Sequence, residues 1–138
     1  MMLENLHETY KLLANCGPAT RGGVELLELC FGSVPDDYLE LISEATYVEI
    51  EHDDGQYIRI WAPGDCVESY KSYKIDEYIP TAVPIGDDGG GEIILYVDGG
   101  RGFGLYHVNA GDLDLDEAVW IASSLRKLLT EAKGIESF

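Results

Sequence analysis

The stretch that decides the fold is Val83-Pro84-Ile85-Gly86-Asp87-Asp88-Gly89-Gly90-Gly91-Glu92-Ile93-Ile94-Leu95-Tyr96-Val97. Its second half, residues 92–97, has the most apolar strand pattern of the chain and predicts a central, buried strand. Residues 86–91 predict a tight loop before that strand, because glycine adopts positive φ angles without steric cost. The prolines at 80 and 84 predict an edge segment, since proline offers no N–H to a strand ladder.

Further strands are expected on both sides of this stretch. Apolar and polar residues alternate over 47–51 and again over 57–61, and the turn residues Asp53-Asp54-Gly55-Gln56 lie between them. This pattern predicts an antiparallel hairpin. On the carboxyl side, the glycine-rich segment 98–104 predicts a turn into a strand over 105–108.

Apolar residues at helical spacing predict five helices. Their buried stripes are Leu3, Leu6, Tyr10 and Leu13; Val24, Leu27 and Phe31; Tyr38, Leu41, Ile42 and Ala45; Cys66, Val67 and Tyr70; and Ala118, Ile121, Ala122, Leu125, Leu128 and Leu129. Ser33 and Asp114 are expected to cap the third and the last of these helices. Gly32 and Gly134 are expected to end the second and the last.

Helices that precede a run of antiparallel strands, followed by a helix, are typical of an α+β fold rather than of alternating βαβ units. The 138 residues suit one domain, 1–138, with a mainly antiparallel sheet, N-terminal helices and a C-terminal helix packed on it. Residues 1–20 would carry an extra N-terminal helix.

The charge balance narrows the possible partners. The chain has 26 Asp plus Glu against 9 Lys plus Arg, a formal net charge of -17. Nucleic acids and anionic lipid surfaces bind through Lys and Arg, so neither is an expected partner. We expect no secretory leader, because the first residues lack its pattern, and no membrane span, because no apolar run reaches the roughly 20 residues that crossing a bilayer takes. A basic protein partner remains, or an acidic surface kept for solubility.

The reactive residue types show no catalytic or metal-binding spacing. Three cysteines, Cys16, Cys30 and Cys66, form no CxxC pair, so we expect a reducing, cytoplasmic compartment and buried or half-buried thiols. His7 and His52 are expected to be independent of each other and of His107, and no serine-nucleophile motif is present. A spatially assembled Cys-His pair stays open, but we predict no enzyme, no catalytic residue, no metal and no cofactor.

The glycine-rich segments do not match the motifs that bind calcium, phosphate or dinucleotides. Residues 87–92 lack oxygen ligands at alternate positions, as calcium would need, and lack the lysine of a phosphate loop. Residues 99–104 miss the dinucleotide-binding glycine spacing. The glycines therefore indicate backbone geometry, and Asp87 and Asp88 are expected to be exposed.

Acidic residues and aromatic residues interleave along much of the chain. Carboxylates cluster at 49–54, 65–68, 76–77 and 112–117. The aromatic residues among them are Tyr47, Tyr57, Trp61, Tyr70, Tyr73 and Tyr78. This combination suits an interface for arginine and lysine, through charge pairing and cation–π contact. The alternative is a solvated acidic shell over half-buried aromatic core residues.

Several short motifs, in this order and spacing, resemble the SUKH superfamily, in particular the branch similar to fungal cell-wall-assembly regulators. The resemblance covers about residues 24–129. Its motifs are Leu26-Leu27-Glu28-Leu29, Val34-Pro35-Asp36-Asp37-Tyr38-Leu39-Glu40-Leu41, Ile60-Trp61-Ala62-Pro63, Tyr78-Ile79-Pro80, residues 83–92, Leu113-Asp114 and Ile121-Ala122-Ser123-Ser124-Leu125. The chain departs from the family in its N-terminal helix and in lacking an Asn-Gly turn after Ala45.

The resemblance implies a non-catalytic α+β domain of the bacterial toxin-immunity type, which binds and blocks a polymorphic toxin, often a nuclease. Fungal relatives act as regulatory interaction modules, so a regulatory or scaffolding module with a non-toxin partner is the alternative. Motif position and local charge give the candidate residues. Partner contacts are expected at Trp61, Asp65, Glu68, Asp87 and Asp88, and loop shaping at Gly86, Gly89, Gly90 and Gly91.

Overall fold

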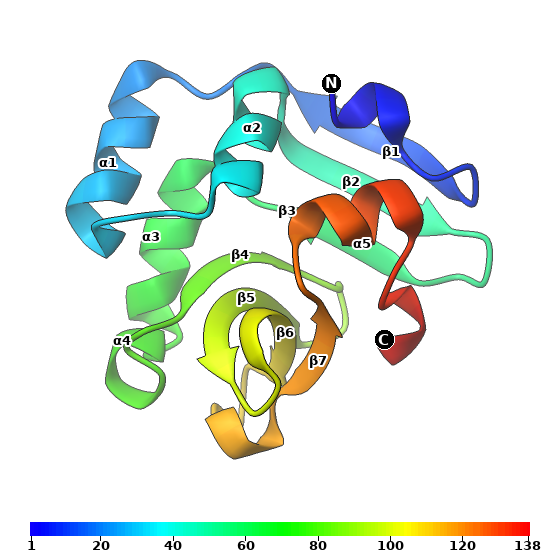
Figure 1. Cartoon of the computed structure of the whole chain (residues 1–138). Coiled ribbons are helices and arrows are strands. Elements are labelled where there is room, and N and C mark those ends of the chain that lie inside the picture. Colours follow the sequence, from blue (N-terminus) through cyan, green and yellow to red (C-terminus); the bar gives the residue numbers. More distant parts are fainter.

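The computed structural model describes residues 1–138 and shows one α+β domain, as predicted (Figure 1). The strands are β1 (Tyr10–Cys16), β2 (Thr46–His52), β3 (Tyr57–Ile60), β4 (Val83–Asp87), β5 (Glu92–Gly99), β6 (Gly102–Asn109) and β7 (Val119–Ala122). The helices are α1 (Arg21–Phe31), α2 (Asp36–Glu44), α3 (Pro63–Ser72), α4 (Ile75–Tyr78) and α5 (Leu125–Glu131), with 3-10 turns at Leu3–Asn5, Leu115–Glu117 and Ile135–Ser137. None of these helices is long and apolar enough to cross a bilayer.

The seven strands form one antiparallel sheet in chain order, so each strand pairs with its neighbours in sequence. The predicted hairpin is confirmed as β2 and β3, in which Val48 lies opposite Ile60 and Ile50 opposite Ile58. Residues 93–97 of β5 are all buried, and β5 lies inside the sheet between β4 and β6. The most apolar stretch of the sequence therefore does form a central strand.

The prediction of an edge segment at the prolines is wrong. Pro84 belongs to β4, which lies in the middle of the sheet, and the edges are β1 and β7. Proline is tolerated there because β3 ends early: only Gly86 and Asp87 of β4 have β3 partners, whereas Pro84 pairs with β5 alone. Beyond the end of β3, a missing N–H in β4 disrupts no ladder on that side.

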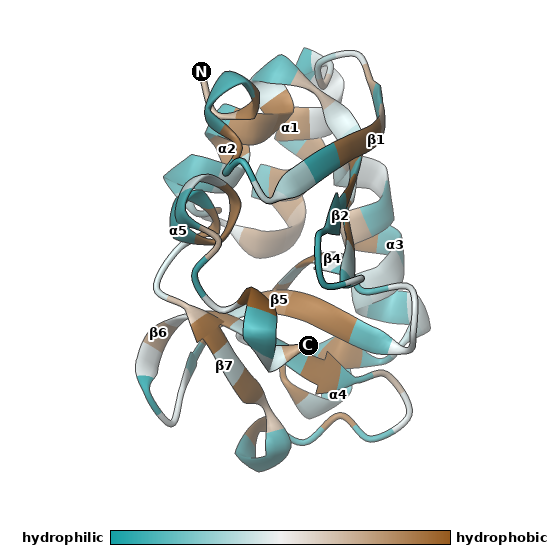
Figure 2. Ribbon diagram, turned by 90° about the vertical axis from the view of Figure 1, so that its right-hand side faces the viewer, coloured by the Kyte–Doolittle hydropathy of each residue, from teal (hydrophilic) through white to brown (hydrophobic).

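Helices cover the sheet in two groups. In Figure 1, α1 and α3 lie side by side, and α3 packs against β4, whereas α2 contacts α5. Figure 2 shows a long hydrophobic stretch on β5 and mixed hydrophobic and hydrophilic residues along the helices. The apolar sides meet in one continuous core of 31 buried residues, which fits a single domain.

A buried tyrosine joins the second group of helices to the sheet. The Tyr96 hydroxyl of β5 donates to the Asp37 carboxylate of α2 at 2.6 Å. The same oxygen accepts the Leu125 backbone N–H at 2.7 Å, and Asp37 also accepts the Arg126 N–H at 3.1 Å. Burial is the largest cause of the raised pKa of Tyr96. The hydroxyl therefore stays protonated and keeps both helix N-termini at the sheet.

The predicted N-terminal helix over residues 1–20 is wrong. A single 3-10 turn is followed by β1, whose Tyr10 and Leu12 lie opposite His52 and Ile50 of β2. The Tyr10 hydroxyl donates to the Leu128 carbonyl at 2.6 Å. The free edge of β2 offers backbone partners to this segment, and that tertiary pairing overrides a weak local helical pattern.

The predicted C-terminal helix is also too long. The stripe that begins at Ala118 divides into strand β7, paired with β6, and helix α5, which starts after Ser124. Asp114 caps only a 3-10 turn, and the Ser124 side chain, by accepting the Lys127 N–H, caps α5. Helix α5 ends at Glu131, and its C-cap is Ala132 with φ +55 rather than Gly134. Residues 119–122 pair with the edge of β6 as a strand, and the spacing of apolar residues alone did not distinguish this strand from a helix.

The remaining helix ends are mixed. Gly32 ends α1 with φ +78, as predicted, whereas Ser33 does not cap α2: Pro35 holds the N-cap position without a side-chain hydrogen bond. Cys66 is the one fully buried residue of the predicted inward stripe of α3, and Val67 and Tyr70 are half-buried. These ends matter because α3 carries part of the site described next.

Candidate functional site

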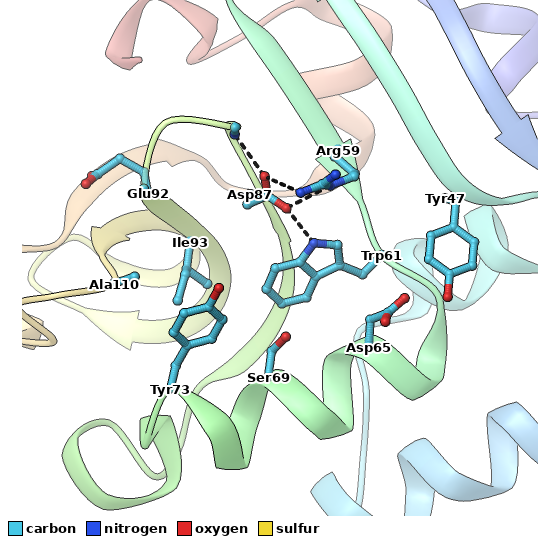
Figure 3. Close-up of a pocket in the computed structure, with 12 residues that line it drawn as sticks. Tyr47, Arg59, Trp61, Asp65, Ser69, Tyr73, Asp87, Glu92, Ile93 and Ala110 are labelled. Carbon is cyan, nitrogen blue, oxygen red and sulfur yellow. Dashed lines mark hydrogen bonds and ion pairs between the residues drawn. The ribbon is translucent and has the colours of Figure 1, made fainter.

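A pocket of about 440 Å³ opens between α3 and the strands β2 to β5 (Figure 3). The predicted residues Trp61, Asp65, Asp87, Gly89 and Gly91 line it. The other four predicted residues do not line it, although they lie on adjoining segments: Glu68, Gly86, Asp88 and Gly90. The structure thus brings most of the predicted site residues together around one cavity.

Asp87 is fully engaged inside this pocket. Its carboxylate accepts Arg59 Nε at 3.0 Å, Arg59 Nη2 at 3.2 Å, Trp61 Nε1 at 2.6 Å and the Gly89 backbone N–H at 2.8 Å. Hydrogen bonding to Asp87 is the main cause of the raised pKa of Arg59. Two oxygens with four donors have little capacity left for a partner, so this carboxylate builds the pocket wall.

Gly86 makes that network possible, because it allows β3 and β4 to approach closely. A Cβ atom added at Gly86 would lie 2.3 Å from the Arg59 carbonyl oxygen. Gly86 and Asp87 are strand residues, so the predicted loop over 86–91 is two residues too long at its start. The expected role of Gly86 is therefore a close approach of two strands rather than a turn.

The turn itself is built by Asp88 and two glycines with positive φ, +75 at Gly89 and +101 at Gly91. The Asp88 carboxylate accepts the Gly90 N–H at 2.8 Å and the Glu92 N–H at 3.0 Å. Asp87 and Asp88 are both half-buried, so the expectation that they are exposed is wrong. Short aspartates often turn back onto the backbone in this way.

Trp61 packs into the hydrophobic core at the base of the pocket. Its side chain is 7% exposed, and its carbonyl accepts the Tyr38 hydroxyl at 2.7 Å. That hydroxyl also lies 3.1 Å from Cys66 Sγ. Burial raises the pKa of the Cys66 thiol to about 12 and raises that of Tyr38 as well. Both groups stay neutral at ordinary pH and give the pocket a firm base.

Asp65 differs from Asp87, although both line the pocket. It lies in the first turn of α3, and its Oδ2 atom is buried without a hydrogen-bond partner. In Figure 3 the Tyr47 hydroxyl points toward this carboxylate, and side-chain hydrogen bonding with Asp65 is the largest cause of the raised pKa of Tyr47. Tyr47 itself has φ +50, an uncommon conformation for a bulky residue.

Tyr47 and Tyr73 were expected only as aromatic residues among the carboxylates. Three further lining residues were not expected at all: Arg59, Ser69 and Glu92. Arg59 could have been found, because it alternates with Ile58 and Ile60 on the hairpin and is one of 9 cationic residues. Ser69 and Glu92 have no sequence signal of this kind. Their positions depend on how α3 packs against β4 and β5.

The histidines and cysteines are placed differently from expectation in part. His107 is buried, with Nδ1 2.7 Å from Glu92 Oε1 and Nε2 3.0 Å from the Ser137 carbonyl. His7 and His52 are half-buried, and each packs edge-on against Tyr10, with centroid distances of 6.4 and 5.5 Å. The three cysteines are unpaired; Cys16 is exposed, contrary to prediction, Cys30 is half-buried and Cys66 is buried.

No cluster of three or more histidine, cysteine or acidic side chains is arranged to hold a metal ion. The chemistry that the pocket does offer is a carboxylate with an unpaired oxygen beside aromatic rings. No protein-family model matches this chain, and no curated protein shows significant sequence similarity to it.

Proposed function

We propose that this protein is a non-catalytic, acidic binding module that captures and neutralises a basic toxin domain, of the nuclease type, in the bacterial cytoplasm. The class of partner comes from the SUKH resemblance of the quoted motifs. The physical support comes from the charge of the surface and from the pocket beside α3.

The observation that carries the proposal is the imbalance of ion pairs. Of the 26 carboxylates, only four pair with a Lys or Arg side chain within the protein. No acidic residue is fully buried. Unpaired like charges repel one another and lower the stability of the compact state, and a basic partner would offset that cost.

Charge alone does not select one face of the molecule. Exposed carboxylates occur near the N-terminus, on α1, on the β2–β3 hairpin, on α4 and around the 3-10 turn at Leu115–Glu117. The pocket adds what the general charge lacks, because it combines a concave shape with aromatic rings and carboxylates. Aromatic anchors in a concave surface are typical centres of protein interfaces.

The proposal is tested by asking whether a neighbouring gene encodes a basic toxin domain, and whether co-expression of this protein with that domain restores growth. We expect growth to be restored, and we expect the association rate of the purified proteins to fall at least tenfold from low to physiological salt. A salt-independent rate, or no binding, would contradict it. A regulatory module with a non-toxin partner would show salt-sensitive binding to that partner but no rescue from the toxin.

A further inference from the structure

Four charged residues line the pocket beside α3, and three of them already have partners. Arg59 pairs with Asp87 at 3.0 Å. Glu92 lies 2.7 Å from the His107 imidazole. Asp65 is the one of the four without an ionisable partner within 4 Å.

Asp65 is also unusual in the whole molecule. Its Oδ2 is the sole buried side-chain nitrogen or oxygen atom that lacks a hydrogen-bond partner. Buried polar atoms in folded proteins are nearly always bonded, and each exception needs an explanation. The N-terminus of α3 favours a negative charge at this position, but it supplies no hydrogen bond to Asp65. The Asp65 carboxylate, which lines the pocket, therefore keeps hydrogen-bonding capacity that the protein itself does not use.

Aromatic rings beside Asp65 indicate what kind of donor fits. Tyr47, Trp61 and Tyr73 line the same pocket, and Tyr47 and Tyr73 are 42% and 46% exposed. Figure 3 shows Asp65 between Tyr47 and the helix, with Trp61 next to it, whereas Tyr73 lies on the far side of Trp61, beside Ile93. Ring faces attract organic cations, and a carboxylate pairs with them directly.

The backbone of Tyr47 supports a functional role for its ring. Tyr47 adopts φ +50 next to a register irregularity, where Cys16 of β1 lies opposite Thr46. A left-handed conformation costs a bulky residue free energy, and such strain tends to occur at binding sites. Here the strained residue presents its hydroxyl toward Asp65 and leaves its ring partly open to solvent (Figure 3).

We propose that this pocket binds one cationic side chain of the partner, a lysine or an arginine, with Asp65 as its counter-charge and the rings of Tyr47 and Trp61 beside it. The inference rests on the proposed function for the identity of the partner. The pocket chemistry, a cation held by one carboxylate among aromatic rings, can be tested without any toxin.

A titration of the ¹⁵N-labelled protein with N-acetyl-arginine amide and with N-acetyl-lysine amide provides that test. We expect saturable shifts at the Trp61 indole N–H and at the amides of Asp65 and Ser69. N-acetyl-citrulline amide, the neutral isostere of the arginine probe, should produce none of them. Equal shifts with citrulline, or shifts spread over the acidic hairpin at 49–54, would overturn the proposal.

A pair of variants on α3 tests the role assigned to Asp65. Asp65→Asn should weaken binding of both cationic probes about tenfold, which is the loss expected for one charge-assisted hydrogen bond. Glu68→Gln makes the same charge change one turn away, on an exposed residue outside the pocket, and should weaken binding less than about twofold. Equal effects of the two variants would show that only the general charge acts.

The two proposals can fail separately. Probe binding that depends on Asp65, without rescue from the toxin, would contradict the proposed function and leave the cation pocket standing. Rescue from the toxin together with no probe binding would overturn the pocket and leave the binding module standing.

Discussion

Two aspartates line one pocket and differ in almost everything except residue type. Asp87 accepts hydrogen bonds from two side chains and a backbone N–H, whereas one oxygen of Asp65 has no partner at all. Both were candidate contacts on sequence grounds. The difference teaches that an acidic residue in a motif can serve as a wall of a site. The oxygen without a hydrogen-bond partner, rather than the motif, indicates which carboxylate is still able to bind a ligand.

The largest expected effect concerns the strand approach that creates the Asp87 corner. Gly86→Ala places a Cβ 2.3 Å from the Arg59 carbonyl oxygen. Because backbone must move to accept it, we expect a loss of about 3 kcal/mol in the free energy of unfolding. Urea unfolding measures this loss. Gly64→Ala, where an added Cβ meets no atom within 4 Å, is the control, and equal effects would show that the close approach is unimportant.

Neutralising Asp87 should act mainly on stability. Asp87→Asn weakens its bonds to Arg59 and Trp61, and we expect a loss of about 2 kcal/mol in the free energy of unfolding. Chemical denaturation followed by tryptophan fluorescence measures it. If the variant keeps its stability while its affinity for cations falls, Asp87 rather than Asp65 is the binding carboxylate.

The buried Cys66 thiol beneath the pocket predicts that the free energy of unfolding falls at alkaline pH. The pKa of the Cys66 thiol is raised from 9.0 to about 12 in the folded protein. Above pH 9 the unfolded thiol therefore ionises first, and stability falls by up to about 1.4 kcal/mol per pH unit. Below pH 9 this group contributes no slope.

Denaturation at several pH values tests that pH dependence. Cys66→Ser keeps a hydroxyl near Tyr38 but does not ionise in this range, so its stability should stay flatter between pH 9 and 10. An unchanged slope in the variant would assign the alkaline loss to other groups.

The smallest expected effect sharpens the Asp65 side of the comparison. Tyr47→Asn places a residue that tolerates left-handed backbone at φ +50. We expect stability to change by less than about 1 kcal/mol. Because one ring leaves the pocket, affinity for N-acetyl-arginine amide should fall about threefold. A variant that binds as tightly as the wild type would exclude Tyr47 from the site.

The sequence was most informative where local pattern and tertiary environment agree. Residues 92–97 and the β2–β3 hairpin have patterns that only buried or half-buried strands satisfy, and both were predicted correctly. Residues 10–16 and 118–122 have apolar spacing that also suits a helix, and the free edges of β2 and β6 decided in favour of strands. A local pattern does not show which sheet edge is available.

The site was predictable in membership but not in role. Trp61, Asp65 and Asp87 were identified from motif position and charge, and they do share one pocket. Arg59 lies opposite Asp87 in the β3–β4 register, and this placement decides which carboxylate is hydrogen-bonded within the protein. That register follows from Gly86 and from the early end of β3, features that become visible only in three dimensions.

The affinity of Asp65→Asn for a basic toxin domain that the wild-type protein neutralises tests the central proposal most directly. We predict that it binds about tenfold more weakly than the wild type, with a free energy of unfolding within about 1 kcal/mol of the wild-type value. Unchanged affinity in a folded Asp65→Asn protein would contradict the proposal that this pocket receives the partner's cationic side chain.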